Sequence, residues 1–124
     1  MKKILLLEDE EALGRLYKKR LDLAGYETIW TKTAEETEEI AKKFNADAVL
    51  IDHAIKGHEK SGLDITPKIK KLLPKSKLIV LSNYDQFHLE EEAKNFNVDK
   101  YLLKIETPPT ELVKFLDELL KNNT

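Results

Sequence analysis

Acidic, hydroxyl and ammonium side chains follow four short apolar runs of this sequence. Taken singly, such residues mean little, because Asp and Glu after a strand often only cap a helix or form a turn. Their joint appearance after similar runs indicates a common chemical role. The residues are Glu8 and Asp9 after residues 3–7, Asp52 after residues 47–51, Ser82 after residues 77–81 and Lys104 at the end of residues 100–104.

The acids could attack phosphorus if the fold gathered them around a metal ion. Like charges at close range repel and raise one another's pKa unless a cation joins them. Mg²⁺ suits such a group because it prefers carboxylate and carbonyl oxygens. A carboxylate beside Mg²⁺ can attack a phosphoryl group, since the metal and an ammonium offset the charge on the transferring oxygens. On this hypothesis Asp52 is the nucleophile, Lys104 the ammonium and Ser82 a hydroxyl donor.

The apolar runs before these residues are predicted strands of one parallel sheet. Residues 3–7, 47–51, 77–81 and 100–104 are too short for buried helices, and they are uniformly apolar, as strands covered on both faces are. Residues 26–30 alternate more, which suits a strand nearer the edge.

Segments with helical spacing separate the strands. Gly25 ends the first helix in the usual stop position. Thr33 followed by Glu36 is a capping box that opens the second helix. The expected buried faces are Leu13, Leu16, Tyr17, Leu21 and Ala24 in the first helix and Thr37, Ile40, Ala41 and Phe44 in the second.

The third and fourth helices are less regular in sequence. The third begins either at a capping box of Ser61 and Asp64, with Pro67 as a kink, or late, with Thr66 as its cap. Residues 85–96 form the expected fourth helix.

The alternation of strands and helices predicts the fold. The fifth helix has Thr107 as its cap and Pro108 in its first position, so the order is strictly alternating through one domain, residues 1–124. This order predicts an α/β fold, a doubly wound (βα)5 three-layer sandwich around a parallel sheet. Ligands of such sheets bind beyond the carboxyl ends of the strands, which is where the candidate residues lie.

The composition indicates no partner by charge alone. Hydrophobic residues make up 41% and charged residues 35%, and the 21 Lys and Arg nearly balance the 23 Asp and Glu. We therefore expect no nucleic-acid binding and no membrane association, and a cytoplasmic location. The absence of Cys excludes disulfides, thiolate nucleophiles and thiolate metal sites.

Along essentially its whole length the chain resembles the receiver domain of bacterial two-component response regulators. The matching segments are "ILLLEDEEAL", "DAVLID" ending in Asp52, "SGLDI", "LIVLS" ending in Ser82 and "KYLLK" ending in Lys104. Together these motifs are specific. The resemblance implies a flavodoxin-like sheet in the strand order 2-1-3-4-5.

The resemblance also implies a role for each site residue. Asp52 would accept phosphate from a phosphohistidine on a sensor histidine kinase or a phosphotransfer protein. Asp9 would bind Mg²⁺ directly, Glu8 largely through water, and Ala54 through its backbone carbonyl. Ser82 would donate to the new phosphoryl group, and Lys104 would pair with it.

The output implied by the resemblance is a change of surface. Tyr101 matches an aromatic that rotates inward as Ser82 shifts, which alters the face built from the fourth helix, fifth strand and fifth helix. That face would engage a downstream output protein or domain, or a second copy of the chain. The domain is not expected to be an enzyme beyond its own phosphoryl transfer and slow autodephosphorylation.

Some positions depart from the family's pattern. Lys56 and Ile105 stand where proline is common, and the loop from Asp52 to Gly62 is about two residues longer than usual. These departures motivate an alternative, a receiver-like binding module that works without phosphorylation. His53, His58 and His88 lack the spacing of a transition-metal site.

Other phosphate-handling classes fit less well. The haloacid dehalogenase-like phosphatases and the topoisomerase-primase domain need a further acid where this chain has Ala54. A flavodoxin would need a phosphate-cradling loop after the first strand, where the acidic segment "EDEE" would repel phosphate.

We predict that the phosphorylated form loses its phosphate slowly. Ala54 has no side-chain group to orient an attacking water, and Asn83 could narrow access to the acyl phosphate. The decay of the phosphorylated protein in Mg²⁺ at neutral pH tests this, and decay within seconds would contradict it.

Overall fold

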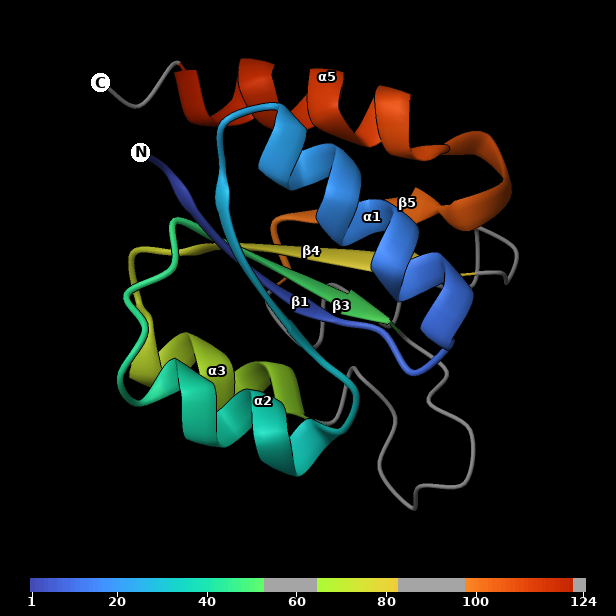
Figure 1. The fold of residues 1–124 in the computed structure, drawn as a ribbon. Coiled ribbons are helices and arrows are strands. Elements are labelled where there is room, and N and C mark those ends of the chain that lie inside the picture. Colours follow the sequence, from blue (N-terminus) through green and yellow to red (C-terminus); the bar gives the residue numbers. More distant parts are fainter. Residues whose placement is uncertain (53–64, 83–97, 122–124) are drawn as a thin grey trace.

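The computed structural model describes residues 1–52, 65–82 and 98–121, with the side chain of Ser82 excepted. Figure 1 shows the elements in order along the chain. They are β1 (Lys3–Leu7), α1 (Glu11–Leu23), β2 (Glu27–Thr31), α2 (Ala34–Ala41), β3 (Ala48–Asp52), α3 (Thr66–Leu72), β4 (Lys77–Ser82), β5 (Lys100–Leu103), the 3₁₀ turn η2 (Lys104–Glu106) and α5 (Pro109–Lys121).

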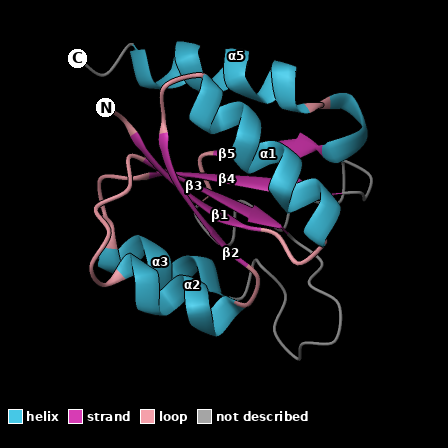
Figure 2. Ribbon diagram, viewed as in Figure 1, coloured by secondary structure: helices cyan, strands magenta, loops and turns pink. Residues whose placement is uncertain are grey.

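The sheet has five parallel strands in the order β2-β1-β3-β4-β5, which confirms the predicted topology. Within it, Leu7 pairs with Ile51, Ile51 with Val80, and Ser82 with Leu103. Helices α1 and α5 cover one face, and α2 and α3 cover the other (Figures 1 and 2). The fold is therefore the doubly wound sandwich that the alternating sequence predicts, with the flavodoxin-like strand order that the family resemblance implies.

Alternate residues of the strands supply the two halves of the core. Leu5, Val49 and Val80 point toward α2 and α3, whereas Ile4 and Leu50 point toward α1 and α5. These side chains are completely buried, so each contributes about 1.5–3 kcal/mol relative to exposure. The central strands are apolar on both faces because helices cover both.

The buried face of α1 differs from the prediction at two positions. Tyr17 and Leu21 are buried as expected, but Leu16 is 43% exposed and Ala24 lies at the exposed end of the helix. Gly14 takes the place facing the sheet, and a Cβ there would lie 2.2 Å from the Trp30 ring. Helix α1 therefore presents Gly14, and not Leu16, to the sheet, because only glycine leaves room there for the Trp30 indole.

The turns around α1 and α2 agree with the sequence signals. Gly25 has φ +96°, the left-handed conformation that ends a helix and favours glycine. At α2, the Thr33 hydroxyl accepts from Glu36 N at 3.1 Å. The Glu36 carboxylate accepts from the backbone N of Lys32 at 2.8 Å, one residue before the partner of a standard capping box.

The expected buried face of α2 is confirmed in part. Thr37 and Ala41 are buried, while Ile40 and Phe44 are half-buried at the edge of the core.

Within the described residues, helix α3 begins at Thr66, close to the later of the two predicted starts. Its first residue is Thr66 and Pro67 follows, in the first turn where a missing N–H costs nothing. Thr66 is helical, and Ile65 holds the cap position that we expected for Thr66. The other predicted start, at Ser61 and Asp64, lies outside the described residues, as does the expected helix of residues 85–96.

The prediction for the start of the fifth helix is wrong by one residue. Helix α5 begins at Pro109, because the tight turn η2 occupies Lys104–Glu106 first. Thr107 therefore does not cap α5; its hydroxyl donates to the carbonyl of Leu103 at 2.7 Å.

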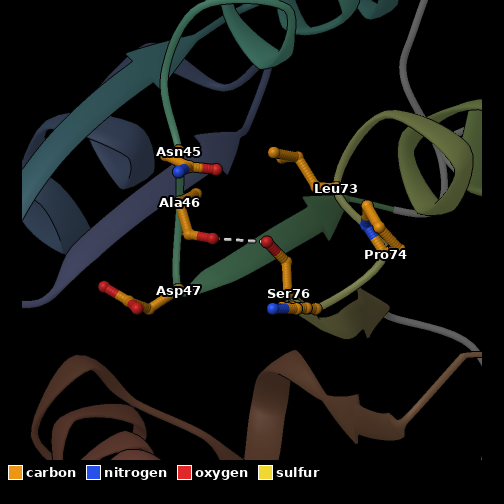
Figure 3. A pocket seen from close by; sticks show the side chains of 7 residues that line it. Asn45, Ala46, Asp47, Leu73, Pro74 and Ser76 are labelled. Atoms are coloured by element: carbon orange, nitrogen blue, oxygen red, sulfur yellow. Dashed lines mark hydrogen bonds between the residues drawn. The ribbon is translucent and has the colours of Figure 1, made fainter.

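A hollow of about 350 Å³ lies at the amino ends of β3 and β4 (Figure 3). Its walls come from the two turns before those strands, and the Ser76 hydroxyl bridges them by donating to the carbonyl of Ala46. This hollow is at the opposite end of the sheet from the residues that the sequence singles out.

We predict that Gly14→Ala destabilises the protein by about 1–3 kcal/mol, because the added methyl group overlaps the Trp30 ring. On helix propensity alone the change would stabilise α1 by about 1 kcal/mol. Urea unfolding measures the difference. In a Trp30→Ala background the same change should be neutral or stabilising; an equal loss there would contradict a clash with Trp30.

Candidate phosphoryl-transfer and metal site

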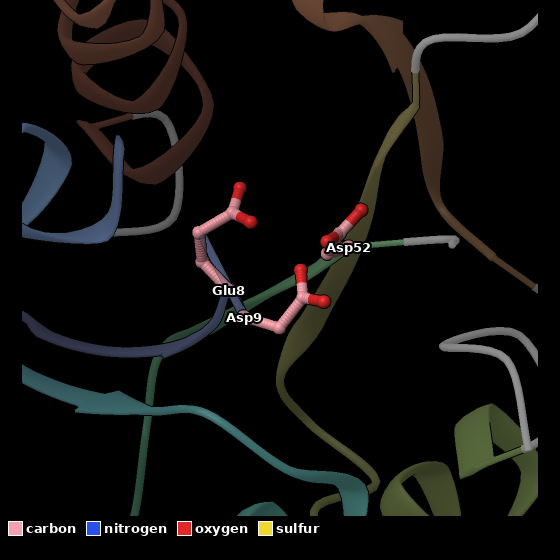
Figure 4. A group of neighbouring side chains, drawn as sticks. All are labelled: Glu8, Asp9 and Asp52. Carbon is pink, nitrogen blue, oxygen red and sulfur yellow. The ribbon is translucent and has the colours of Figure 1, made fainter. Parts of the chain in front are cut away.

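The predicted acids meet at the carboxyl ends of β1 and β3. Glu8 and Asp9 directly follow β1, and Asp52 is the last residue of β3, which is paired with β1. Figure 4 shows the three side chains directed into one space. Ligand oxygens of Glu8, Asp9 and Asp52 lie within 4.8 Å of one another. The adjacency of β1 and β3 in the sheet is what brings these residues together.

Lys104, which directly follows the edge strand β5, contacts two of these acids. Its Nζ lies 2.8 Å from Glu8 Oε1 and 3.2 Å from Asp52 Oδ1. The side chains of Glu8 and Asp52 are 1% and 5% exposed, and that of Lys104 is 9% exposed. A buried ion pair of this kind is costly to form and strongly destabilising to break at one end. Among the described residues, Lys104 pairs with two of the three carboxylates of this group.

The surroundings shift the proton affinities of the two central groups. Burial raises the pKa of Asp52 to about 8, the nearby Glu8 carboxylate adds to the rise, and Lys104 opposes it. Burial by itself would lower the pKa of Lys104, but its contacts with Glu8 and Asp52 outweigh burial and raise that pKa. A cation bound beside Asp52 would favour its ionised, nucleophilic form.

Glu8 is held in place by the neighbouring strand β2. Its backbone N donates to the Thr31 carbonyl at 3.0 Å, and its carbonyl accepts from the Trp30 indole at 2.9 Å. Its second carboxylate oxygen accepts from the backbone N of Glu10 at 3.1 Å. The position of the first acid is therefore determined by the turn that it begins and by β2.

Trp30 and Gly14 contribute to this site, and their contribution was not predicted from the sequence. Trp30 is far from the acids in sequence, Gly14 follows them closely, and neither residue type is characteristic of a metal site. The sequence feature that could have indicated this contact is a glycine inside a predicted helix together with the chain's single tryptophan in a predicted edge strand, since such a glycine often marks close packing.

The remaining predicted site residues differ in how far the structure places them. Tyr101 lies in β5 opposite Val80, is 4% exposed and packs in the core toward α2 and α3. Ser82 ends β4 opposite Leu103, at the same edge of the sheet as the acids, but its side chain is outside the described part. Ala54 and the acceptor loop lie outside the described residues.

The acidic group fits a hard divalent cation. It offers carboxylate oxygens from two adjacent strand ends, and Asp9 is only half-buried, so water can complete a coordination shell. Glu11, at the start of α1, forms ion pairs with Arg15 and Lys32 on the surface. It is not part of the acidic group.

In the presence of a chelator, we predict that Asp52→Asn stabilises the protein at pH 8 by more than about 1 kcal/mol. The folded-state pKa of Asp52 lies above its ordinary value, so the wild type loses stability as pH rises from about 4 to about 8, whereas Asn cannot ionise. Urea unfolding across this pH range measures the difference, which should vanish near pH 4. Asp22→Asn, on the exposed side of α1, is the control. A constant difference at all pH values would contradict the prediction.

No helix in the described part of the chain is long and apolar enough to span a bilayer.

Comparison with known proteins agrees with this geometry. A curated relative, the polar-differentiation response regulator DivK of Brucella ovis, is 33% identical over 69 residues. That match covers 56% of this chain and 54% of the relative, so the chain spans about half the length of the curated relatives it matches.

Solved structures share the fold over nearly the whole chain. A CheY-like response regulator receiver domain protein from Methanospirillum hungatei superposes with a TM-score of 0.88 at 25% identity, covering 98% of this chain and 95% of that one. A Burkholderia pseudomallei response regulator with a phosphorylated aspartic acid, calcium ion and citrate gives 0.78 at 21% identity, covering 98% and 75%. The model of the response regulator receiver domain matches residues 4–117. The chain therefore belongs to the response regulator receiver domain family.

Proposed function

We propose that Asp52 is the phosphoacceptor of a two-component phosphorelay. The observation that carries this assignment is the position of the Lys104 ammonium, 2.8 Å from Glu8 and 3.2 Å from Asp52, inside a cluster of three carboxylates. The phosphorylated aspartic acid in the Burkholderia pseudomallei regulator of the same fold supports it.

The proposed reaction transfers a phosphoryl group from a phosphohistidine. A carboxylate oxygen of Asp52 attacks phosphorus in line with the departing imidazole, so that an O–P bond forms while the N–P bond breaks. The imidazole takes up a proton as it leaves. Lys104 then pairs with the phosphoryl oxygens, exchanging part of its contact with Asp52 for one with the new group. Ser82 would donate its hydroxyl to the same oxygens.

The proposed cofactor is Mg²⁺, which Asp9 and Asp52 would bind directly, Glu8 largely through water, and Ala54 through its backbone carbonyl. When bound, it offsets the charge that builds up on the transferring oxygens. The chain's own contribution is to hold the acids close together before the ion arrives. The backbone of Glu8 is hydrogen-bonded to Thr31 and Trp30 of β2, independently of the contacts that its carboxylate makes.

The proposed partners follow from family membership. The phosphoryl donor would be a sensor histidine kinase or a phosphotransfer protein, and the signal would pass to a downstream output protein or domain. A cytoplasmic location goes with this role. Tyr101 and Ser82 would couple phosphorylation to the face that includes β5 and α5, which could also pair two copies of the chain. The chemistry would be limited to the domain's own phosphoryl transfer and autodephosphorylation.

We predict that incubation with acetyl phosphate and Mg²⁺ adds the mass of one phosphoryl group to the wild type, as measured by intact-protein mass spectrometry. Asp52→Asn should gain none, because the amide lacks the attacking oxygen, and a chelator should suppress the gain in the wild type. If a folded wild-type protein gains no mass, the chain is instead a receiver-like binding module that works without phosphate.

A further inference from the structure

Tyr17 links the first helix to the turn that carries the ammonium of the site. It is 1% exposed in the middle of α1, and its hydroxyl donates to the backbone carbonyl of Thr107 at 3.3 Å, across 90 positions of sequence. In the apolar layer between α1 and α5, its ring packs in the same cluster as Leu21 and Leu112.

The acceptor of this hydrogen bond is itself fixed to the turn η2. The backbone N of Thr107 donates to the carbonyl of Lys104 at 3.1 Å, and its hydroxyl donates to the carbonyl of Leu103 at 2.7 Å. Thr107 is 6% exposed. Through Thr107, the Tyr17 hydroxyl is therefore linked to the backbone of Leu103 and Lys104, from which the Lys104 side chain extends.

Within the sheet, the two sides of the site are connected only through two intervening strands. In the order β2-β1-β3-β4-β5, the strand before Glu8 and the strand before Lys104 are separated by β3 and β4. The ammonium of Lys104 nonetheless lies 2.8 Å from a Glu8 oxygen. Helix α1 starts at Glu11, just after the acids, so a bond from α1 to the turn η2 spans this gap directly.

We propose that Tyr17 is a positioning residue for Lys104. Its hydroxyl holds the turn η2 against α1 and thereby keeps the ammonium between Glu8 and Asp52. The inference rests on the proposed phosphoacceptor function. Burial raises the pKa of Tyr17 to about 12, with Lys104 lowering it and Glu8 raising it, so the hydroxyl keeps its proton and acts as a donor throughout the working range of pH.

The test compares Tyr17→Phe with Tyr26→Phe. Each change removes one hydroxyl that forms a long-range hydrogen bond. The partner of Tyr17 is Thr107, just before α5, and the partner of Tyr26 lies within α5. The Tyr26 hydroxyl bonds to Asp117 Oδ1 at 2.6 Å, and Tyr26 precedes β2, at the end of the sheet away from the acids. The control thus removes the shorter hydrogen bond of the two at a place remote from Lys104.

With acetyl phosphate and saturating Mg²⁺, Tyr17→Phe should slow phosphorylation about three-fold to ten-fold, the effect of one lost hydrogen bond, while Tyr26→Phe changes the rate less than about two-fold. In a Lys104→Met background, Tyr17→Phe should change the rate by less than about two-fold, because the group that it positions is absent. Equal rates for Tyr17→Phe and wild type, or the same slowing without Lys104, would overturn the proposal.

A second measurement does not depend on phosphorylation. The ¹⁵Nζ resonance of Lys104 in the unphosphorylated protein should move in Tyr17→Phe and stay in place in Tyr26→Phe. Failure of the wild type to accept phosphate therefore refutes the proposed function, whereas an unmoved Lys104 resonance refutes the positioning role. If Tyr17→Phe does not fold, Thr107→Val removes the other side-chain bond of the same turn and should give the same shift and the same slowing; no change in either would count against the proposal.

Discussion

The contact of one buried ammonium with two buried carboxylates is the constraint on which the rest of the site depends. Lys104, Glu8 and Asp52 come from three different strand ends, and all are nearly inaccessible to water. Charges in such a place are tolerated only when they are paired, so an error in the position of any one leaves another unpaired. The packing of the sheet and helices must therefore place three backbones accurately.

The strand order is what makes this placement possible. Because β1 and β3 are neighbours, two acids at their ends are adjacent without any long loop. Lys104 reaches the same place from β5, two strands beyond β3, by the length of its side chain. A sheet with consecutive strands side by side would place β2 between β1 and β3 and would separate the acids.

Much of this could be predicted from the sequence. Short apolar runs, capping signals and Gly25 predict the alternating fold, and the acids and the lysine at the carboxyl ends of β1, β3 and β5 predict the groups that the structure brings together. The start of α5 could not be predicted from local signals, because both Pro108 and Pro109 can open a helix and the turn η2 decides between them. The direct Glu8–Lys104 contact and the roles of Trp30, Gly14 and Tyr17 depend on packing across the sheet, which no local pattern encodes.

The bond from the Trp30 indole to the Glu8 carbonyl has an optical consequence. Trp30 is the chain's single tryptophan, so the intrinsic emission of the protein excited at long ultraviolet wavelengths comes from one place. That fluorophore is bonded to the backbone of an acid in the cluster and is contacted by the Lys32 ammonium at 5.0 Å from its ring centre. The chain therefore carries its single tryptophan fluorophore directly beside the acidic edge of the sheet, with no dye attached.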